Sequence, residues 1–126
     1  MSGGVGMTNA EFRDMMEART TKYAIDVFKL LKSLPPDISV KVIAYQLGKS
    51  ASSIGANYHE ANRSESRDDF VHKVSIALKE ANESIYWLKV VNGLFDDNDA
   101  IKRIAEETTE LRNLLQKIVR TAKSRH

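Results

Sequence analysis

The feature that most constrains this sequence is how rarely its periodic segments are interrupted. The chain has 126 residues but only two prolines, adjacent at Pro35-Pro36, and six glycines, three of them within the first six residues. Proline ends helices because it lacks a backbone donor and disfavours α geometry in the residue before it. Few interruptions leave long stretches in which apolar residues recur at helical spacing. The sequence therefore predicts an all-α chain built from a few long helices.

Four such segments stand out, and local signals indicate where each ends. Pro35-Pro36 ends the first, Asp37 or Ser39 caps the second unless Pro36 is its first residue, and Asn92-Gly93 stops the third. We expect helices over residues 9 or 17 to 33, 37 to 63, 67 to 92 and 100 to 123. The connections between them are short, so consecutive helices should be antiparallel neighbours in an up-down-up-down four-helix bundle.

Each predicted helix carries one row of apolar residues that would form the bundle core. The rows are Tyr23, Val27, Leu30, Leu31 and Leu34; Val40, Ile43, Leu47, Ile54, Tyr58 and Ala61; Phe70, Val74, Ala77, Ala81, Ile85 and Leu88; and Ile101, Ala105, Thr108, Leu111, Leu115, Val119 and Ala122. We assign residues 9–126 to one bundle domain and residues 1–8 to a flexible N-terminal tail.

A second set of large apolar residues lies off these rows. Ile25, Phe28, Val42 and Tyr45 belong to it, as do four residues on another side of the third helix. They reflect either a wide core face with scattered exposure or a self-association surface, and we favour the second because monomers rarely expose large apolar patches. The predicted oligomer interface on the third helix consists of Ile76, Trp87, Val90 and Leu94.

Sequence motifs for catalysis or metal binding are missing. The chain has no cysteine, which excludes disulfides, thiol catalysis and Cys-ligated metals. A carboxylate di-iron bundle needs two Glu-x-x-His pairs, whereas this chain has one Asp69-x-x-His72. His59-Glu60 begins a zinc-protease pattern, but Arg63 occupies the position of its second histidine. We expect no enzymatic activity, no cofactor and no metal.

A row of polar residues flanks the predicted core of the second and third helices. We expect an interhelical polar cluster of Asn57, Glu60, Lys73, Glu80 and Glu83. Its main interpretation is pairing and register between helices, and a catalytic cleft is the weaker alternative. Gly55 and Ala56 lower helix propensity beside this row, which indicates a close approach of two helices.

The same region resembles a known family. The residues that carry the resemblance are the run from Ser53 to Ala61 (SIGANYHEA), Ser66, Asp69-Phe70, Lys73 and the run from Ile76 to Leu88 (IALKEANESIYWL). The sequence is similar, over about residues 17–122, to bacterial four-helix-bundle proteins first noticed as products of intervening sequences in large-subunit ribosomal RNA genes. That family includes the accessory variability determinant of diversity-generating retroelements. It usually has arginine or a similar residue in place of His59 and often threonine in place of Ser84.

The resemblance implies an antiparallel four-helix bundle, a homopentameric ring and no known enzymatic activity. For the retroelement relatives it implies binding to a reverse transcriptase and to RNA or DNA through a basic surface. An alternative is a structural product of a mobile insertion that acts only through protein contacts.

The charge distribution gives a reason to consider nucleic acid although the net charge is only +2. No acidic side chain follows Glu110, and five such chains in a ring would together carry about +10. The basic residues either complement the helix dipole or contact phosphates. The candidate contacts are Lys22, Lys29, Lys32, Arg112, Lys117, Arg120, Lys123 and Arg125. No membrane-spanning run or signal peptide is recognised, so we expect a cytoplasmic protein.

Overall fold

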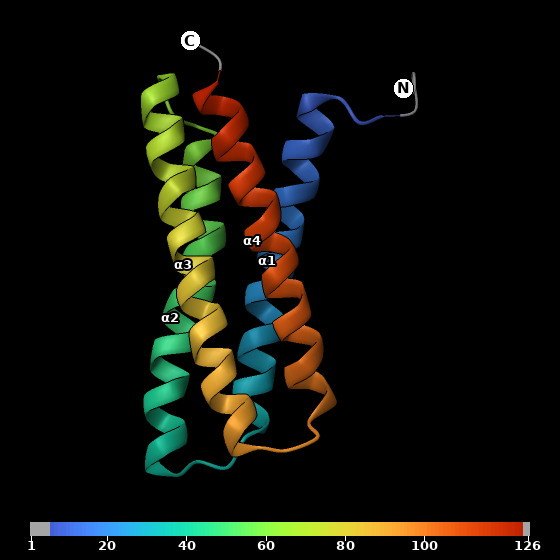
Figure 1. The fold of residues 1–126 in the computed structure, drawn as a ribbon, viewed down its shortest axis with the longest axis vertical. Coiled ribbons are helices and arrows are strands. Elements are labelled where there is room, and N and C mark those ends of the chain that lie inside the picture. Colours follow the sequence, from blue (N-terminus) through green and yellow to red (C-terminus); the bar gives the residue numbers. More distant parts are fainter. Residues whose placement is uncertain (1–5, 125–126) are drawn as a thin grey trace.

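The computed structural model describes residues 6–124, which form four helices in an antiparallel bundle (Figure 1). The helices are α1 (Asn9–Ser33), α2 (Ile38–Ala61), α3 (Arg67–Leu94) and α4 (Asp99–Lys123). Each helix contacts its neighbours in a ring, with α1 between α2 and α4 and α3 on the opposite side. The predicted all-α bundle is confirmed. Residues 1–5 of the predicted tail, together with Arg125 and His126, lie outside the described residues.

Side-chain caps fix where the helices begin. Thr8 caps the start of α1 in a reciprocal capping box. The Thr8 hydroxyl accepts a hydrogen bond from the Glu11 backbone N–H, and the Glu11 carboxylate accepts one from the Thr8 backbone N–H. Asp37 and Ser66 cap α2 and α3 by accepting from the backbone N–H three residues on. Helix α1 thus starts at Asn9, the earlier of the two predicted positions, because Thr8 supplies the cap.

The predicted stop at Asn92-Gly93 is wrong, because α3 continues to Leu94. Gly93 in a helix costs about 1 kcal/mol relative to alanine. Val91 is fully buried and Phe95 packs against the core, so continuing the helix keeps both in contact with the other helices. Burial of two such side chains outweighs the propensity of a single glycine.

The core contains most of the predicted rows and several residues that periodicity missed. Met16, Thr20, Ala51, Ser84, Val91 and Ile104 are buried in addition to the predicted residues. Leu31, Phe70, Ile85, Ala105 and Ala122, which were predicted as core, are only partly buried. Two hydroxyl contacts cross the core: Ser50 Oγ lies 2.8 Å from Ser84 Oγ, and Tyr23 Oη lies 2.6 Å from Thr108 Oγ1. These four buried hydroxyls are therefore paired between helices, whereas the buried Thr20 hydroxyl donates to the Glu17 carbonyl of its own helix.

Small residues let α1 and α2 approach closely. A Cβ added to Gly55 would lie 3.1 Å from Thr20 Oγ1, and one added to Gly48 would lie 3.0 Å from the Phe28 ring. The close approach predicted at Gly55 thus has a structural counterpart in α1. Ala56 is exposed, so it does not take part in that approach.

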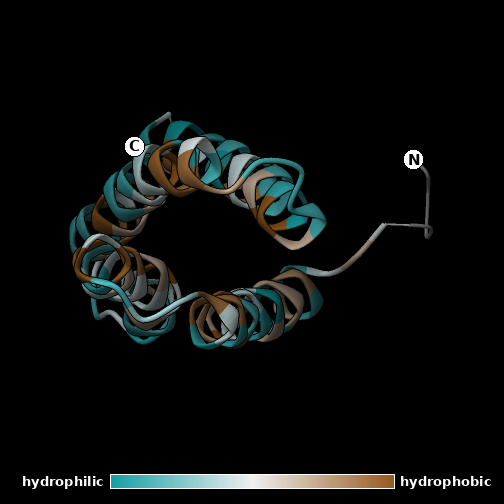
Figure 2. Cartoon of the chain, turned by 90° about the horizontal axis from the view of Figure 1, so that it is seen from below, coloured by the Kyte–Doolittle hydropathy of each residue, from teal (hydrophilic) through white to brown (hydrophobic). Residues whose placement is uncertain are grey.

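Contact between α1 and α4 is the least extensive in the bundle. The two helices diverge toward the end where the chain begins and ends (Figure 1). Viewed along the bundle, the four helices form an open arc, with apolar residues mainly on its inner side (Figure 2). Two cavities along this seam are lined by residues of both α1 and α4.

Candidate functional site

The predicted polar cluster is only partly assembled between α2 and α3. Lys73 Nζ lies 3.3 Å from Glu60 Oε1 and joins the two helices. Asn57 instead donates to the Ser53 carbonyl of its own helix at 2.8 Å. Burial raises the pKa of Glu80, and the neighbouring Glu83 raises it further. Because Glu80 and Glu83 lie on one helix, their proximity does not tie the bundle together.

The buried polar link between α2 and α3 is the pair Ser50 and Ser84. Each hydroxyl also contacts a carbonyl of its own helix, Ser84 that of Glu80 at 2.9 Å and Ser50 that of Leu47 at 3.3 Å, so either serine can donate to the other. Both serines are buried, at core-facing positions of α2 and α3. Their spacing along the predicted rows could have identified them, but a search for rows of apolar residues leaves serines out.

The predicted basic residues fall into two groups at opposite ends of the α1–α4 seam. Lys22 and Lys29 line a cavity with Arg103, next to the first half of α4. Lys117 lines another cavity with Arg13, at the end where α1 begins and α4 finishes. Arg120 and Lys123 are exposed in the last turns of α4, and Lys32 is exposed near the end of α1. Arg112 donates to Asn82 of α3 at 3.2 Å. The prediction thus becomes two separate basic regions.

The residues predicted as an oligomer interface differ in exposure. Trp87 and Val90 are partly buried against the bundle core, and Ile76 is also half-buried. Leu94 is 53% exposed. More apolar surface lies on α1 and α2, where Ile25, Phe28, Ile38, Val42 and Tyr45 are all 46% or more exposed. We call these five residues and Leu94 the apolar outer surface.

A charged clamp closes the middle of the α1–α4 seam. Arg19 donates to both oxygens of Glu107, from Nε at 2.7 Å and from Nη2 at 2.6 Å, and its Nη2 also contacts Glu110 at 3.2 Å. The hydrogen bonds to Glu107 raise the pKa of Arg19. Sequence reasoning missed this clamp because its two sides are 88 residues apart.

A second ionic centre joins α1 to the end of α2. The Glu17 carboxylate accepts from Asn62 Nδ2 at 2.9 Å and from Arg63 Nη1 at 2.9 Å, and His59 Nε2 lies 3.4 Å away. These two hydrogen bonds lower the pKa of Glu17, with the one from Arg63 as the larger cause. His59 also places Nδ1 2.7 Å from the Gly55 carbonyl. His59, the position where the family usually has arginine, thus faces a carboxylate.

The described residues contain neither a metal-binding cluster nor a membrane-spanning helix. Within residues 6–124, no three histidine or acidic residues lie together in a way that could hold a metal ion. Across the same range, no helix is both long and apolar enough to cross a membrane. What the structure offers for binding is therefore surface and cavity: the apolar outer surface, the two basic regions and the α1–α4 seam.

These features define a small antiparallel four-helix bundle whose described residues hold no metal-binding cluster. The chain belongs to the 23S rRNA-intervening sequence protein family, whose model matches residues 15–119. This chain is similar to a protein of known crystal structure, a protein of unknown function from the S23 ribosomal protein family of Bacteroides thetaiotaomicron. The two are 34% identical, the match covers 82% of this chain and 97% of the other, and the TM-score is 0.76. A comparison with curated proteins finds no match.

Proposed function

We propose that this protein is a non-enzymatic scaffold of the cytoplasm that assembles into a homo-oligomer, a pentamer, and binds nucleic acid or a nucleic-acid enzyme through basic surface. The observation that carries the proposal is the apolar outer surface. Ile38, Val42 and Tyr45 are 77%, 53% and 66% exposed, and they occupy one row along the outside of α2. A monomer would leave this row in water, and symmetric self-association is the usual way to cover such a surface.

Neighbouring helices extend that row. The Phe28 ring of α1 packs over Gly48 of α2 and is itself partly exposed, so the apolar outer surface extends from α2 onto α1. Ser50 pairs with Ser84 and Glu60 with Lys73, which brings the last turns of α3 beside the first turns of α2. Leu94 therefore lies at the same end of the bundle as Ile38 and Val42. Three helices thus contribute exposed apolar side chains to one end.

The basic end of α4 supports the nucleic-acid part of the proposal. Lys117, Arg120 and Lys123 are exposed, and in the described residues none forms an ion pair. Repetition around a ring would multiply these charges and so strengthen attraction to phosphates. The partner enzyme in this proposal is a reverse transcriptase, as the retroelement relatives imply. Binding of this kind tolerates sequence variation and weakens as salt rises.

Light scattering tests the assembly. We expect the wild-type protein to have about five times the mass of one chain, and Tyr45→Glu or Val42→Glu to reduce it because a carboxylate would be buried without a partner. Gln116→Glu on α4 is the control, since it makes the same change in charge as Tyr45→Glu at an exposed position outside this surface. A monomeric wild-type protein would refute the assembly.

Salt-dependent binding tests the ligand. We expect wild-type protein to bind RNA or DNA at about 50 mM salt, with affinity falling steeply as salt increases. The triple variant Lys117→Gln, Arg120→Gln and Lys123→Gln should weaken binding and flatten the salt dependence. Its matched control is Lys41→Gln, Lys79→Gln and Lys89→Gln, which removes the same charge elsewhere. An oligomer that binds no nucleic acid would favour the alternative, a protein that acts only through protein–protein contacts.

A further inference from the structure

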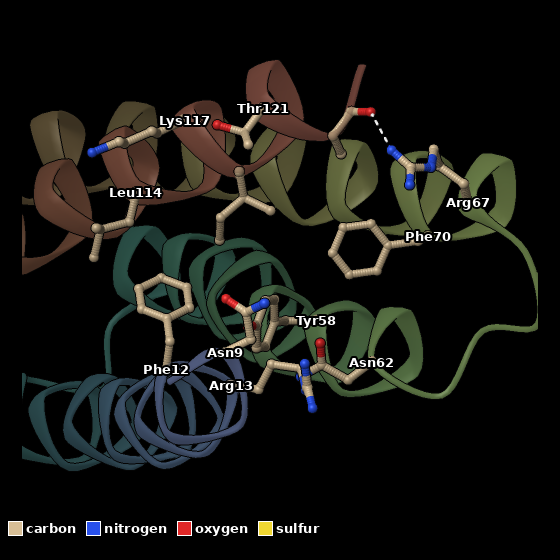
Figure 3. Close-up of a pocket in the computed structure, with 12 residues that line it drawn as sticks. Asn9, Phe12, Arg13, Tyr58, Asn62, Arg67, Phe70, Leu114, Lys117 and Thr121 are labelled. Carbon is tan, nitrogen blue, oxygen red and sulfur yellow. Dashed lines mark hydrogen bonds between the residues drawn. The ribbon is translucent and has the colours of Figure 1, made fainter. Parts of the chain in front are cut away.

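The end of the α1–α4 seam beside the start of α1 contains a cavity of about 600 Å³. All four helices contribute to its wall (Figure 3). Phe12 of α1 faces Leu114 of α4 across it, and Tyr58 of α2, Phe70 of α3 and Ile118 of α4 also line it. Pockets that bind small molecules have volumes of about 300–1,000 Å³ and mainly apolar walls. The cavity therefore has the size and lining of a ligand site.

The charged residues that line this cavity are all positive, namely Arg13, Arg67 and Lys117. Twelve residues line it, and none of them is acidic. Arg13 and Lys117 are exposed, and within residues 6–124 neither forms a hydrogen bond or ion pair. Burial raises the pKa of Tyr58, the charge of Glu17 adds to that rise and the charge of Arg13 opposes it, so both charges act at the cavity wall. An anionic group on a ligand would meet cations, Arg13 and Lys117, that form no ion pair within the described residues.

Contacts between α1 and α4 limit how far a ligand in this cavity could extend along the seam. The clamp of Arg19 with Glu107 and Glu110 closes the seam next to it, and the contact between Tyr23 and Thr108 lies just beyond. A partner helix lying along α1 and α4 would have to break both. The available space therefore suits a compact ligand that enters from the end of the bundle.

We propose that this cavity binds a small amphipathic carboxylate, with an aliphatic or aromatic body between Phe12, Leu114 and Ile118. Its carboxylate is attracted by the positive charges of Arg13 and Lys117, which extend from opposite walls of the cavity (Figure 3). Apolar burial provides most of the affinity, and the two cations select an anion over a neutral or positive molecule. This site is separate from the apolar outer surface and does not depend on the oligomer, and it shares Lys117 with the proposed nucleic-acid surface.

Titration with decanoate, decanol and decylamine tests the site in the full-length wild-type protein. We expect decanoate to bind at least tenfold more tightly than decanol, and decylamine to bind more weakly still. In amide NMR spectra, decanoate should shift the signals of Phe12, Phe70 and Leu114. No binding of decanoate at about 1 mM, equal affinity for decanol, or shifts confined to other residues would overturn the proposal.

Two kinds of variant separate the charge from the cavity. The double variant Arg13→Gln and Lys117→Gln should lose about two- to fivefold in decanoate affinity for each charge removed, with decanol affinity unchanged. Lys41→Gln with Lys79→Gln is the charge-matched control and should bind decanoate as the wild type does. Leu114→Trp should fill the cavity and reduce decanoate binding at least tenfold. Circular dichroism verifies that each variant is folded, and wild-type affinity in the folded charge or cavity variant would refute the site.

Discussion

Tyr23 donates a hydrogen bond to Thr108 in the core between α1 and α4. Their oxygens lie 2.6 Å apart, and the Thr108 hydroxyl donates its own proton to the Ile104 carbonyl at 2.6 Å. Thr108 therefore has only acceptor capacity left, and Tyr23 must be the donor. Burial raises the pKa of Tyr23 to about 12, because the phenolate would lose its hydration. This contact ties α1 to α4 at a point where few others do.

The first prediction concerns stability at alkaline pH. The pKa of Tyr23 is raised in the folded state, so the neutral phenol stabilises the fold. This contribution to the free energy of unfolding is fully present below pH 10 and is lost as pH rises toward 12. A difference of two pKa units corresponds to about 3 kcal/mol. We expect Tyr23→Phe to remove this part of the alkaline loss, as measured by urea unfolding between pH 9 and about pH 12.

Tyr86→Phe is the control for that measurement, since Tyr86 is 57% exposed. It should lose stability with pH as the wild-type protein does. An identical alkaline profile for Tyr23→Phe and wild type would contradict the buried, donor role of Tyr23.

The second prediction concerns the contact of α1 with α2. Gly55→Leu should lower the free energy of unfolding by about 1–3 kcal/mol, because even a Cβ would lie 3.1 Å from Thr20 Oγ1. Gly93→Leu, at a helical site where a Cβ meets nothing within 4 Å, should be neutral or slightly stabilising. Thermal unfolding measures both. Equal melting temperatures for the two variants would show that Gly55 does not set the helix spacing.

The third prediction concerns acid stability. The pKa of Glu17 is lowered in the folded state, so its hydrogen bonds with Arg63 and Asn62 stabilise the fold above its unperturbed pKa of 4.5. This stability is lost as pH falls below 4.5. Glu17→Gln should therefore be less stable than wild type at pH 7 and should approach it at pH 3, as urea unfolding would measure. Glu106→Gln, at an exposed position, should match wild type at both pH values.

The fourth prediction concerns the clamp on the α1–α4 seam. A double-mutant cycle with Arg19→Gln and Glu107→Gln should give a coupling free energy of about 1 kcal/mol, because the contact is bidentate and each side chain is 29% exposed. The same cycle on Lys22 and Asp26, a more exposed pair within one helix, should give about 0.3–0.5 kcal/mol. A clamp coupling no larger than that of the exposed pair would mean that the seam is held by apolar contacts alone.

Helix positions were predictable because their signals are local. Pro35-Pro36 separates the first two helices, and Asp37 caps the second, as the sequence alone indicates. The stop at Asn92-Gly93 failed because Val91 and Phe95 gain more from packing than the helix loses at a glycine. Local propensity decides where a helix can end, and tertiary contacts decide where it does.

The candidate sites were harder to predict because each depends on distant residues. Sequence spacing placed Glu60 and Lys73 on facing helices, and they are in contact. It could not separate Lys29 from Lys117 along the seam, since their distance depends on the register of α1 against α4. The clamp at Arg19 was missed for the same reason.

The sequence by itself determined the four helices, the rows of apolar residues that face inward and the family to which the chain belongs. Those properties depend on spacing and on residues near one another in the chain. Only the tertiary structure decided how far α1 and α4 open, and thus that Phe12 and Ile118 line a cavity rather than meet. It also decided that Trp87 packs partly on its own core while Tyr45 remains exposed. Both outcomes depend on the relative orientation of whole helices, which the sum of many weak contacts sets.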